Sequence, residues 1–285
     1  MTISPSQFHE DGYAIVRGVF PAGEMAAIRG EVEALEGEAL RHHASYRDHN
    51  LYFEIARDPQ LDRRVVLQAH WFSWINARLE QLRRDPRLLP LLQPLLGADI
   101  KQIANQIHWK PPGGKLTSYR YHQDIRFREH PEDFSDIAGG CLNLGLAIDA
   151  QTAANGALRL IPASHRKGYL GLSDDGPIMT GSNSEEELRA AGLDPDSIVV
   201  CELEPGDVVM WTLLTVHGSA PNTSTRDRRF NINSYVRADT TDRGEWAFKN
   251  GVSTPLGAEP RLCKYEELYS KPGPYYVEDE WWAEA

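Results

Sequence analysis

Apolar residues recur at helical spacing in the first third of the chain. In residues 21–36 they lie three or four positions apart, at Met25, Ile28, Val32 and Leu35, which predicts an amphipathic helix. Less regular spacing of apolar residues predicts further helices. Two prolines in the last of them are unfavourable inside a helix. We expect helices over residues 6–11, 21–36, 71–84 and 88–96, and one strand over residues 13–19.

From residue 99 the pattern changes to short runs that are rich in β-branched and aromatic residues. Turn-forming residues separate the runs, for example Pro111-Pro112-Gly113-Gly114 and Pro205-Gly206-Asp207. Many short strands with such turns are typical of a sandwich or barrel of the jelly-roll kind. We expect strands over residues 102–109, 141–148, 158–161, 198–203, 208–212 and 230–236.

The order of these runs predicts one domain over residues 1–285. No linker divides the chain, so a helix-rich N-terminal third is expected to pack on a jelly-roll core at about residues 99–240. Residues 173–197 are polar and rich in Gly, Asp and Ser, which predicts a long insert or lid loop.

Composition indicates an ordinary globular protein and restricts its partners. Of the 285 residues, 41% are hydrophobic and 25% are charged, and the formal net charge is −11. So acidic a chain is a poor general binder of nucleic acid or of acidic membranes. The apolar runs are far shorter than a membrane span, and the N-terminus does not resemble a signal peptide. With three dispersed cysteines, these features predict a cytoplasmic protein that acts on a small molecule.

Two of the ten histidines lie in a sequence context that suits a metal site. His122 and Asp124 form an HxD, and residues two apart in an extended segment point to the same face. His217 follows much later, after enough strands for the chain to return to the same place. Two histidines and one carboxylate form the facial triad of non-haem Fe(II) oxygenases. The alternatives are a chance HxD and a histidine in a capped turn.

Arg228, eleven residues after His217, suggests the cosubstrate. 2-Oxoglutarate chelates iron through its 1-carboxylate and keto oxygen, and its distal carboxylate then needs a buried cation. The planar fork of arginine binds a carboxylate through two hydrogen bonds, and Ser219 could add a hydroxyl donor. Because Arg228 lies in a charged run, residues 226–229, a surface charge is the alternative reading.

Five segments carry a resemblance to a known family. They are FHEDGYAIV at residues 8–16, YHQD at 121–124, NGALRLIPASH at 155–165, PGDVV at 205–209 and HGSAPN at 217–222. In this order they resemble the phytanoyl-CoA dioxygenase family. The resemblance implies a double-stranded β-helix, mainly β with flanking helices. It also implies an Fe(II)- and 2-oxoglutarate-dependent dioxygenase that uses O₂ to hydroxylate, desaturate or cyclise a small organic molecule, releasing succinate and CO₂.

The resemblance also assigns residues to roles. It implies that the iron ligands are His122, Asp124 and His217, and that Arg228 and Ser219 hold 2-oxoglutarate. Members often place a further polar contact to 2-oxoglutarate on the strand before the HxD. His108 and Gln106 are the candidates here, although a partly buried strand histidine would explain His108 equally well.

Two further features bear on the substrate. Arg120, Arg126 and Arg128 flank the HxD and could meet a carboxylate or phosphate, with Arg126 as our candidate; a solvated charged loop is the alternative. Gly145 lies where many members of the family carry an aromatic residue, a change that would enlarge the pocket.

A different class of function fits part of the same pattern. A jelly roll with two histidines and one carboxylate could bind zinc, or could be a binding module with a vestigial site. Neither alternative has a use for a buried clamp for a carboxylate, so Arg228 favours the oxygenase.

Overall fold

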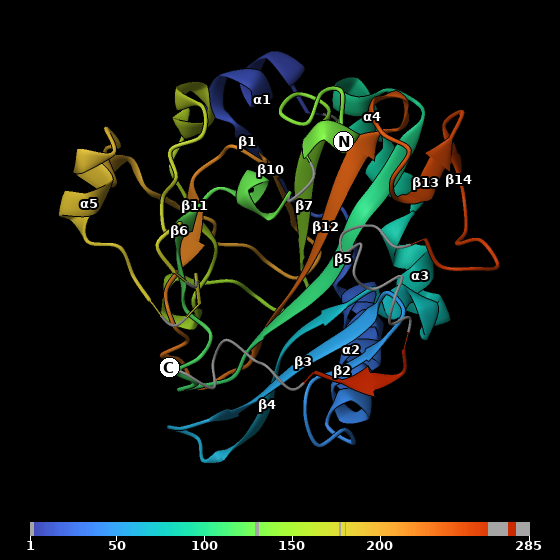
Figure 1. The fold of residues 1–285 in the computed structure, drawn as a ribbon, viewed down its shortest axis with the longest axis vertical. Coiled ribbons are helices and arrows are strands. Elements are labelled where there is room, and N and C mark those ends of the chain that lie inside the picture. The colour runs from blue at the N-terminus through green and yellow to red at the C-terminus, as the bar shows by residue number, and fades with distance from the viewer. Residues whose placement is uncertain (1–2, 129–130, 177, 180, 262–272, 278–285) are drawn as a thin grey trace.

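The computed structural model describes residues 3–128, 131–176, 178–179, 181–261 and 273–277 (Figure 1). Two antiparallel sheets dominate the described part of the chain. The larger has the strand order β1-β10-β7-β12-β5-β4-β3-β2-β15, with β13 and β14 beside β5, and the smaller has the order β6-β11-β8-β9. This arrangement confirms the predicted jelly roll.

The larger sheet consists of β1 (Tyr13–Val16), β2 (Tyr46–Asp48), β3 (Leu51–Asp58), β4 (Arg63–His70), β5 (Ile100–Lys110), β7 (Cys141–Ala147), β10 (Val208–Thr212), β12 (Arg228–Arg237), β13 (Glu245–Lys249), β14 (Val252–Ser253) and β15 (Tyr275–Tyr276). The smaller sheet consists of β6 (Tyr119–His122), β8 (Arg159–Leu160), β9 (Val199–Val200) and β11 (His217–Ser219). The α-helices are α1 (Pro5–Asp11), α2 (Ala22–Ala39), α3 (Ala77–Arg83), α4 (Leu89–Leu96) and α5 (Glu185–Ala190). Two of the 3₁₀ turns matter below, η1 (Phe72–Trp74) and η3 (Asp124–Phe127).

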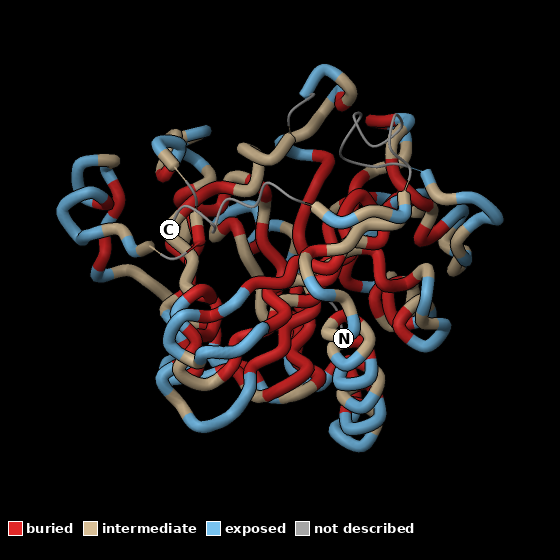
Figure 2. The backbone as a smooth tube through the Cα atoms, turned by 60° about the horizontal axis from the view of Figure 1, so that its bottom comes forward, coloured by how far each residue is buried: buried red, intermediate tan, exposed pale blue. Residues whose placement is uncertain are grey.

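Successive side chains along the central strands point to opposite faces of the larger sheet. One face is covered by helices and the other is the inner face. On β7, Leu142 and Leu144 belong to the same buried apolar cluster as Met25 and Ile28 of α2. Asn143, between the two leucines, points to the opposite face and lines a cavity. The helix predicted from apolar spacing is therefore present as α2, and its apolar side covers the larger sheet (Figure 1). Figure 2 shows the buried residues concentrated at the centre, and the exposed ones on outer turns and loops.

The expectation of a helix-rich N-terminal third is wrong for residues 46–70. Three strands, β2, β3 and β4, lie there and extend the larger sheet beyond β5. Charged residues interrupt the alternation of apolar and polar positions that would predict these strands. Some of these charged residues are buried. Asp58 is fully buried at the end of β3 and accepts hydrogen bonds from four backbone amides, those of Gln60, Leu61, Lys115 and Leu116.

Two other predicted elements differ in detail. The helix expected over residues 71–84 is divided into η1 and α3, because Trp71 has a positive φ and Asn76 caps the start of α3. The insert over residues 173–197 contains a short helix, α5, with a capping box between Ser184 and Glu187. No helix among the described residues has the length and apolar character needed to cross a membrane.

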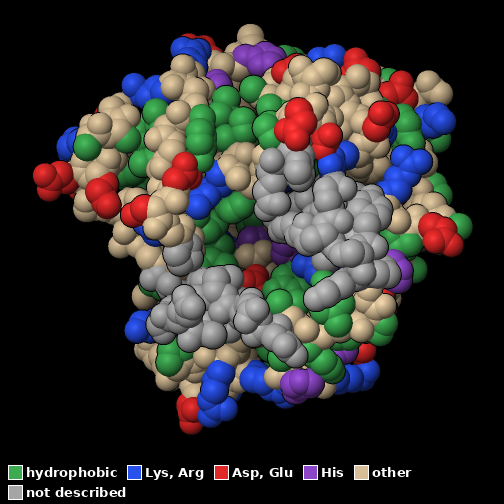
Figure 3. All heavy atoms as spheres, viewed as in Figure 1, with side chains coloured by type: hydrophobic (Ala, Val, Ile, Leu, Met, Phe, Trp, Pro, Cys, Tyr) green, Lys and Arg blue, Asp and Glu red, His purple; other side chains and the backbone are tan. Residues whose placement is uncertain are grey.

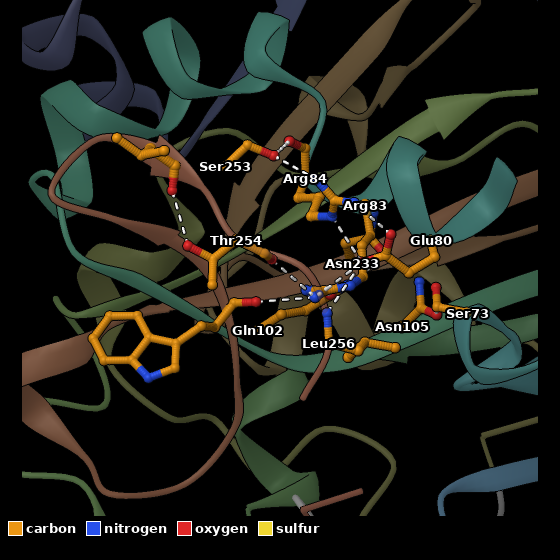
Figure 4. Close-up of polar contacts among 12 residues, drawn as sticks. Ser73, Glu80, Arg83, Arg84, Gln102, Asn105, Asn233, Ser253, Thr254 and Leu256 are labelled. Atoms are coloured by element: carbon orange, nitrogen blue, oxygen red, sulfur yellow. Dashed lines mark hydrogen bonds and ion pairs between the residues drawn. The ribbon is translucent and has the colours of Figure 1, made fainter. Parts of the chain in front are cut away.

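A buried polar network joins α3 to the helix-covered face of the larger sheet (Figure 4). Arg83 is only 1% exposed. Its guanidinium donates to the side chain of Gln102 at 3.2 Å and to the carbonyl oxygens of Trp246 and Thr254 at 3.0 and 3.3 Å. Gln102 in turn donates to Asn233 of β12 at 2.8 Å. The network therefore connects α3, β5, β12, β13 and the residue after β14.

We predict that Arg83→Ala lowers the free energy of unfolding by about 3 kcal/mol or more, since it leaves several buried acceptors without donors. Urea denaturation of the full chain would measure this loss. Arg57→Ala is the control: Arg57 is an exposed arginine paired with an exposed aspartate, so its removal should have a much smaller effect. Equal losses in the two variants would contradict the structural role of the network.

Candidate metal centre and cosubstrate pocket

Strand pairing brings the two predicted histidines together. His122 ends β6 and lies directly opposite His217, the first residue of β11. The chain then turns into η3, which begins at Asp124. The Nε2 atoms of His122 and His217 lie 3.4 and 3.3 Å from the two carboxylate oxygens of Asp124. One potential ligand atom from each residue lies within 4.8 Å of the other two, so the three can hold one metal ion.

Backbone carbonyls set the orientation of both imidazole rings. Nδ1 of His122 lies 2.7 Å from the carbonyl oxygen of Arg120, and Nδ1 of His217 lies 2.9 Å from that of Thr215. A carbonyl oxygen can only accept, so Nδ1 carries the proton and Nε2 keeps a lone pair toward the centre. Burial lowers the pKa of His217 to about 4, so this ring is neutral at neutral pH, the form that binds a metal.

Asp124 is held by two side chains that the sequence did not indicate. Asn143 Nδ2 and Trp211 Nε1 both donate to Asp124 Oδ2, at 2.6 and 3.2 Å. Ser234 donates to the other end of the Asn143 amide at 2.5 Å and so fixes its orientation. Burial alone would raise the pKa of Asp124, but His217 and His122 outweigh it and hold the pKa well below its usual range. The only signal in the sequence was an asparagine inside an apolar strand.

The centre faces a cavity of about 960 Å³ that residues of both sheets line. The alternate residues of β12 form one wall, namely Arg228, Phe230, Ile232 and Ser234. In Figure 3 the cavity is the hollow at the middle of the surface, with histidine and acidic side chains at its floor.

Arg228 is buried at the start of β12, where it is 3% exposed and lines this cavity. One guanidinium nitrogen donates to the carbonyl oxygen of Gly156 at 2.7 Å, whereas its buried Nε has no hydrogen-bond partner. Burial lowers the pKa of Arg228 to about 10. Arg229 instead points to the other face and pairs with Asp149 at 2.7 Å, and Arg226 is exposed. Among these three arginines, only Arg228 faces the cavity.

Lys110 is a second buried cation beside Arg228, and we did not predict it. The two residues lie opposite each other on β5 and β12. Lys110 Nζ donates to Ser219 Oγ at 2.8 Å and to the carbonyl oxygen of Ala220 at 2.6 Å. Burial, helped by Arg228, lowers the pKa of Lys110 well below its usual range. No described carboxylate forms an ion pair with either cation.

His108 and Gln106 line the cavity, but they are bonded within a closed ring of hydrogen bonds. The contacts are Tyr119 Oη to His108 Nδ1 at 3.0 Å, His108 Nε2 to Gln106 Oε1 at 3.2 Å, Gln106 Nε2 to His70 Nδ1 at 3.4 Å, His70 Nε2 to Gln68 Oε1 at 2.9 Å, and Gln68 Nε2 to Tyr119 Oη at 3.3 Å. Each side chain can donate to the next around the ring. Burial lowers the pKa of His108 to about 3, so its ring is neutral.

Two expectations about the substrate pocket can be compared with the structure. Arg126 lines the cavity, but its guanidinium donates to the carbonyl oxygens of Ser173 and Gly176, at 2.7 and 3.3 Å. The expected enlargement at Gly145 is wrong. A Cβ atom there would lie 2.1 Å from the ring of Phe230, so that ring already fills the space.

A family model for phytanoyl-CoA dioxygenase (PhyH) matches residues 8–230, which contain the triad, Arg228 and most of the cavity wall. The chain belongs to the phytanoyl-CoA dioxygenase family. Family membership confirms the predicted enzyme class: the protein is a 2-oxoglutarate-dependent, non-haem iron dioxygenase, with iron as its metal and 2-oxoglutarate and O₂ as cosubstrates.

Individual relatives agree with this family. A probable alpha-ketoglutarate-dependent hypophosphite dioxygenase of Stutzerimonas stutzeri is 29% identical over 237 residues, which cover 82% of this chain and 77% of that protein. An ectoine dioxygenase of Sphingopyxis alaskensis is 27% identical, over 75% of this chain and 69% of its own. The crystal structure of EctD from S. alaskensis with bound Fe has a TM-score of 0.65 at 23% identity, and the match covers 97% of this chain and 87% of that one. This structural similarity supports the jelly-roll fold.

Among the contacts of this dioxygenase, the bond from Asn143 to Asp124 predicts a measurable effect on metal affinity. Asn143→Ala should weaken Fe(II) binding by roughly tenfold or more, because loss of a hydrogen bond that orients a ligand typically has that effect. Anaerobic Fe(II) titration would measure it. Asn233→Ala is a matched control, because that buried asparagine bonds Gln102 and Asn105 on the opposite face. Similar iron affinities in the two variants would contradict the assigned role of Asn143.

Proposed function

We propose that this dioxygenase binds Fe(II) through His122, Asp124 and His217, and holds 2-oxoglutarate between that metal and Arg228. The buried, unpaired cationic end of the cavity carries the proposal. Arg228 and Lys110 lie side by side there without a described acidic partner, although burying a charge without a partner is costly. A dicarboxylate cosubstrate would supply the missing negative charge.

The spacing along β11 suits this cosubstrate. Ser219, which touches Lys110, lies two residues after His217, and two residues of a strand span about 7 Å. That is about the reach of a five-carbon diacid which chelates the metal at one end and meets Ser219 and Arg228 at the other. A zinc hydrolase or a vestigial binding module would have no use for two buried cations at this distance from the triad.

Each group of residues around the proposed iron site then has its own role. Iron, when bound, supplies the activation of O₂ that this enzyme class requires. The carbonyls of Arg120 and Thr215 keep the two imidazoles oriented, and Asn143 keeps the Asp124 carboxylate in place. Apolar side chains, among them Phe230 and Ile232, line the space beside the triad and exclude water from it.

We propose that residues 173–197 act as a cover for this cavity. Met179 and Ile178 line it, and Met179 forms a bridge with Tyr119 of β6. Hydrogen bonds from Arg126 to this segment hold it close to the HxD. We also infer one domain over residues 1–285, supported by the pairing of β4 with β5 and of β1 with β10.

The substrate that we infer is a small polar molecule. The relatives named above are dioxygenases of hypophosphite and of ectoine, both of which are small and polar. Hydroxylation is the simplest outcome, and desaturation or cyclisation would use the same site. A cytoplasmic location is supported by Cys141 and Cys201, which are buried free thiols; Cys263 lies outside the described residues.

We predict that His122→Ala, Asp124→Ala and His217→Ala each abolish tight Fe(II) binding and O₂-dependent succinate release, because two ligands cannot form a facial site. Asp124→Glu should fold but lose most activity, since its longer side chain displaces the ligating oxygen. Anaerobic iron titration and succinate assays would test this. His70→Ala serves as the control, because His70 lines the same cavity outside the triad and should keep its iron. Near-normal iron binding by any of the three alanine variants would remove that residue from the ligand set.

We predict that Arg228→Ala weakens 2-oxoglutarate binding at least about tenfold while iron affinity changes little. Breaking a buried charge pair from one side typically costs about 2–5 kcal/mol, and about 1.4 kcal/mol is a factor of ten. Arg228→Lys should recover only part of the loss, because an ammonium group cannot reproduce the planar fork. The measurement is an anaerobic titration of the iron–2-oxoglutarate charge-transfer absorbance.

Arg226→Ala is the matched control for that titration, since Arg226 is exposed and two residues away. It should bind 2-oxoglutarate as the wild type does. If Arg228→Ala also binds normally, the assigned position of the distal carboxylate is wrong.

A further inference from the structure

A second arginine in the cavity has no partner among the residues that the structure describes. Arg128 follows η3 and lines the cavity together with Asp124. Its Nε is buried and makes no hydrogen bond, and its side chain forms no ion pair within the described part of the chain. A guanidinium in a partly closed cavity that lacks a partner is an unused site for an anion.

The other cations near the HxD are already engaged. Arg120 pairs with Asp175 at 3.0 Å, and Arg126 donates to two carbonyls of the same insert. Arg47, also on the cavity wall, has a partner as well. Of the four arginines that line the cavity, Arg126 also pairs with Asp174 at 3.6 Å and Arg47 has an interaction of its own, whereas Arg128 and Arg228 form no ion pair with a described residue.

These two arginines lie at opposite ends of the cavity. On β12, Arg228 is the first residue and Ser234 lies six residues later, a span of about 20 Å. Ser234 bonds Asn143, which bonds Asp124, so the carboxylate of the triad is near the Ser234 end. Arg128 lies at that same end, because it directly follows η3, which begins at Asp124 and whose Ile125 packs against the cluster that contains Cys141 and Val236.

One molecule of 2-oxoglutarate is too short to reach both arginines. Once its distal carboxylate is at Arg228 and its keto acid end is at the triad, Arg128 remains available on the far side of the metal. The other charged side chains on the cavity wall, Arg47, Glu54 and Arg126, each have an interaction of their own. The polar ring that contains His108 and Gln106 is closed on itself, and Ile178, Met179 and Phe127 are apolar.

We propose that Arg128 binds an anionic group of the substrate, a carboxylate or a phosphorus oxyanion such as a phosphonate, on the Asp124 side of the metal. The proposal rests on the proposed function, because it assigns Arg228 to 2-oxoglutarate. It identifies the substrate class as a small organic anion whose reacting group lies within a few atoms of the charge. The planar fork of Arg128 suits both kinds of oxyanion.

The test uses the full chain loaded with Fe(II) and saturating 2-oxoglutarate, without O₂. Propanoate and methylphosphonate are the anionic probes, and propanamide is the neutral match for propanoate. Calorimetric titration measures the Kd of each probe, and the charge-transfer absorbance shows whether 2-oxoglutarate stays bound. The wild type should bind at least one anion and should bind propanamide at least about tenfold more weakly than propanoate. The preferred anion then distinguishes a carboxylate substrate from a phosphorus oxyanion.

Substitutions at Arg128 test whether its side chain binds the anion. Arg128→Met should weaken binding of the anion at least about tenfold, and Arg128→Lys should lie between Arg128→Met and wild type. Arg57→Met, at an exposed arginine that does not line the cavity, should resemble wild type. All should keep the wild-type affinity for 2-oxoglutarate, which also shows that they are folded. The proposal is overturned if the wild type binds neither anion, if propanamide binds as well as propanoate, or if Arg128→Met binds like the wild type. Failure of the wild type to form the charge-transfer complex would instead refute the proposed function.

Discussion

The pairing of β6 with β11 is the constraint on which the rest of the site depends. It places His122 and His217 side by side on one short antiparallel ladder, and it leaves both Nδ1 atoms facing backbone carbonyls. Neither ring can then rotate without losing a hydrogen bond. The turn after β6 sends Asp124 back toward the same point, where Asn143 and Trp211 of the larger sheet hold its carboxylate. The three residues that could hold a metal ion therefore lie where the small sheet meets the large one.

The larger sheet places charged and polar side chains on the face that lies toward this site. Its strands keep apolar residues on the helix-covered face and present Arg228, Lys110 and Asn143 to the inside. The chain carries a formal net charge of −11, so long-range attraction does not bring anions to the protein. In the proposals made above, recognition of anions would depend on buried or half-buried cations whose hydrogen-bonding capacity the protein leaves unused. Arg228 and Arg128 both meet this description, at the two ends of one cavity.

Spacing along the chain is sufficient to predict that His122, Asp124 and His217 come together, and to single out Arg228 as an arginine that faces the same cavity. An HxD needs only the two-residue period of a strand, and Arg228 could be selected by its offset from His217. Residues whose role depends on distant partners could not be found in this way. Asn143 is a polar residue in an apolar strand and Lys110 ends a strand of mixed composition, and their partners lie 19 and 109 positions away. The sequence cannot distinguish Arg126 from Arg128, because both line the cavity and they differ in that Arg126 bonds carbonyls 47 and 50 positions away.

Four of the five segments that carry the family resemblance meet in space around β11, all except residues 205–209, and these contacts give the resemblance a physical cause. Gly12, in the first segment, has a φ of +79°, and a Cβ atom on it would lie 2.3 Å from the ring of His165 in the third. The carbonyl oxygen of Gly12 accepts the hydroxyl of Thr215, and Ser164 accepts the backbone N–H of Val216. These contacts fix the two residues before His217, including the carbonyl that orients its ring. Segments that lie far apart in the sequence thus jointly support His217, which we propose as a metal ligand.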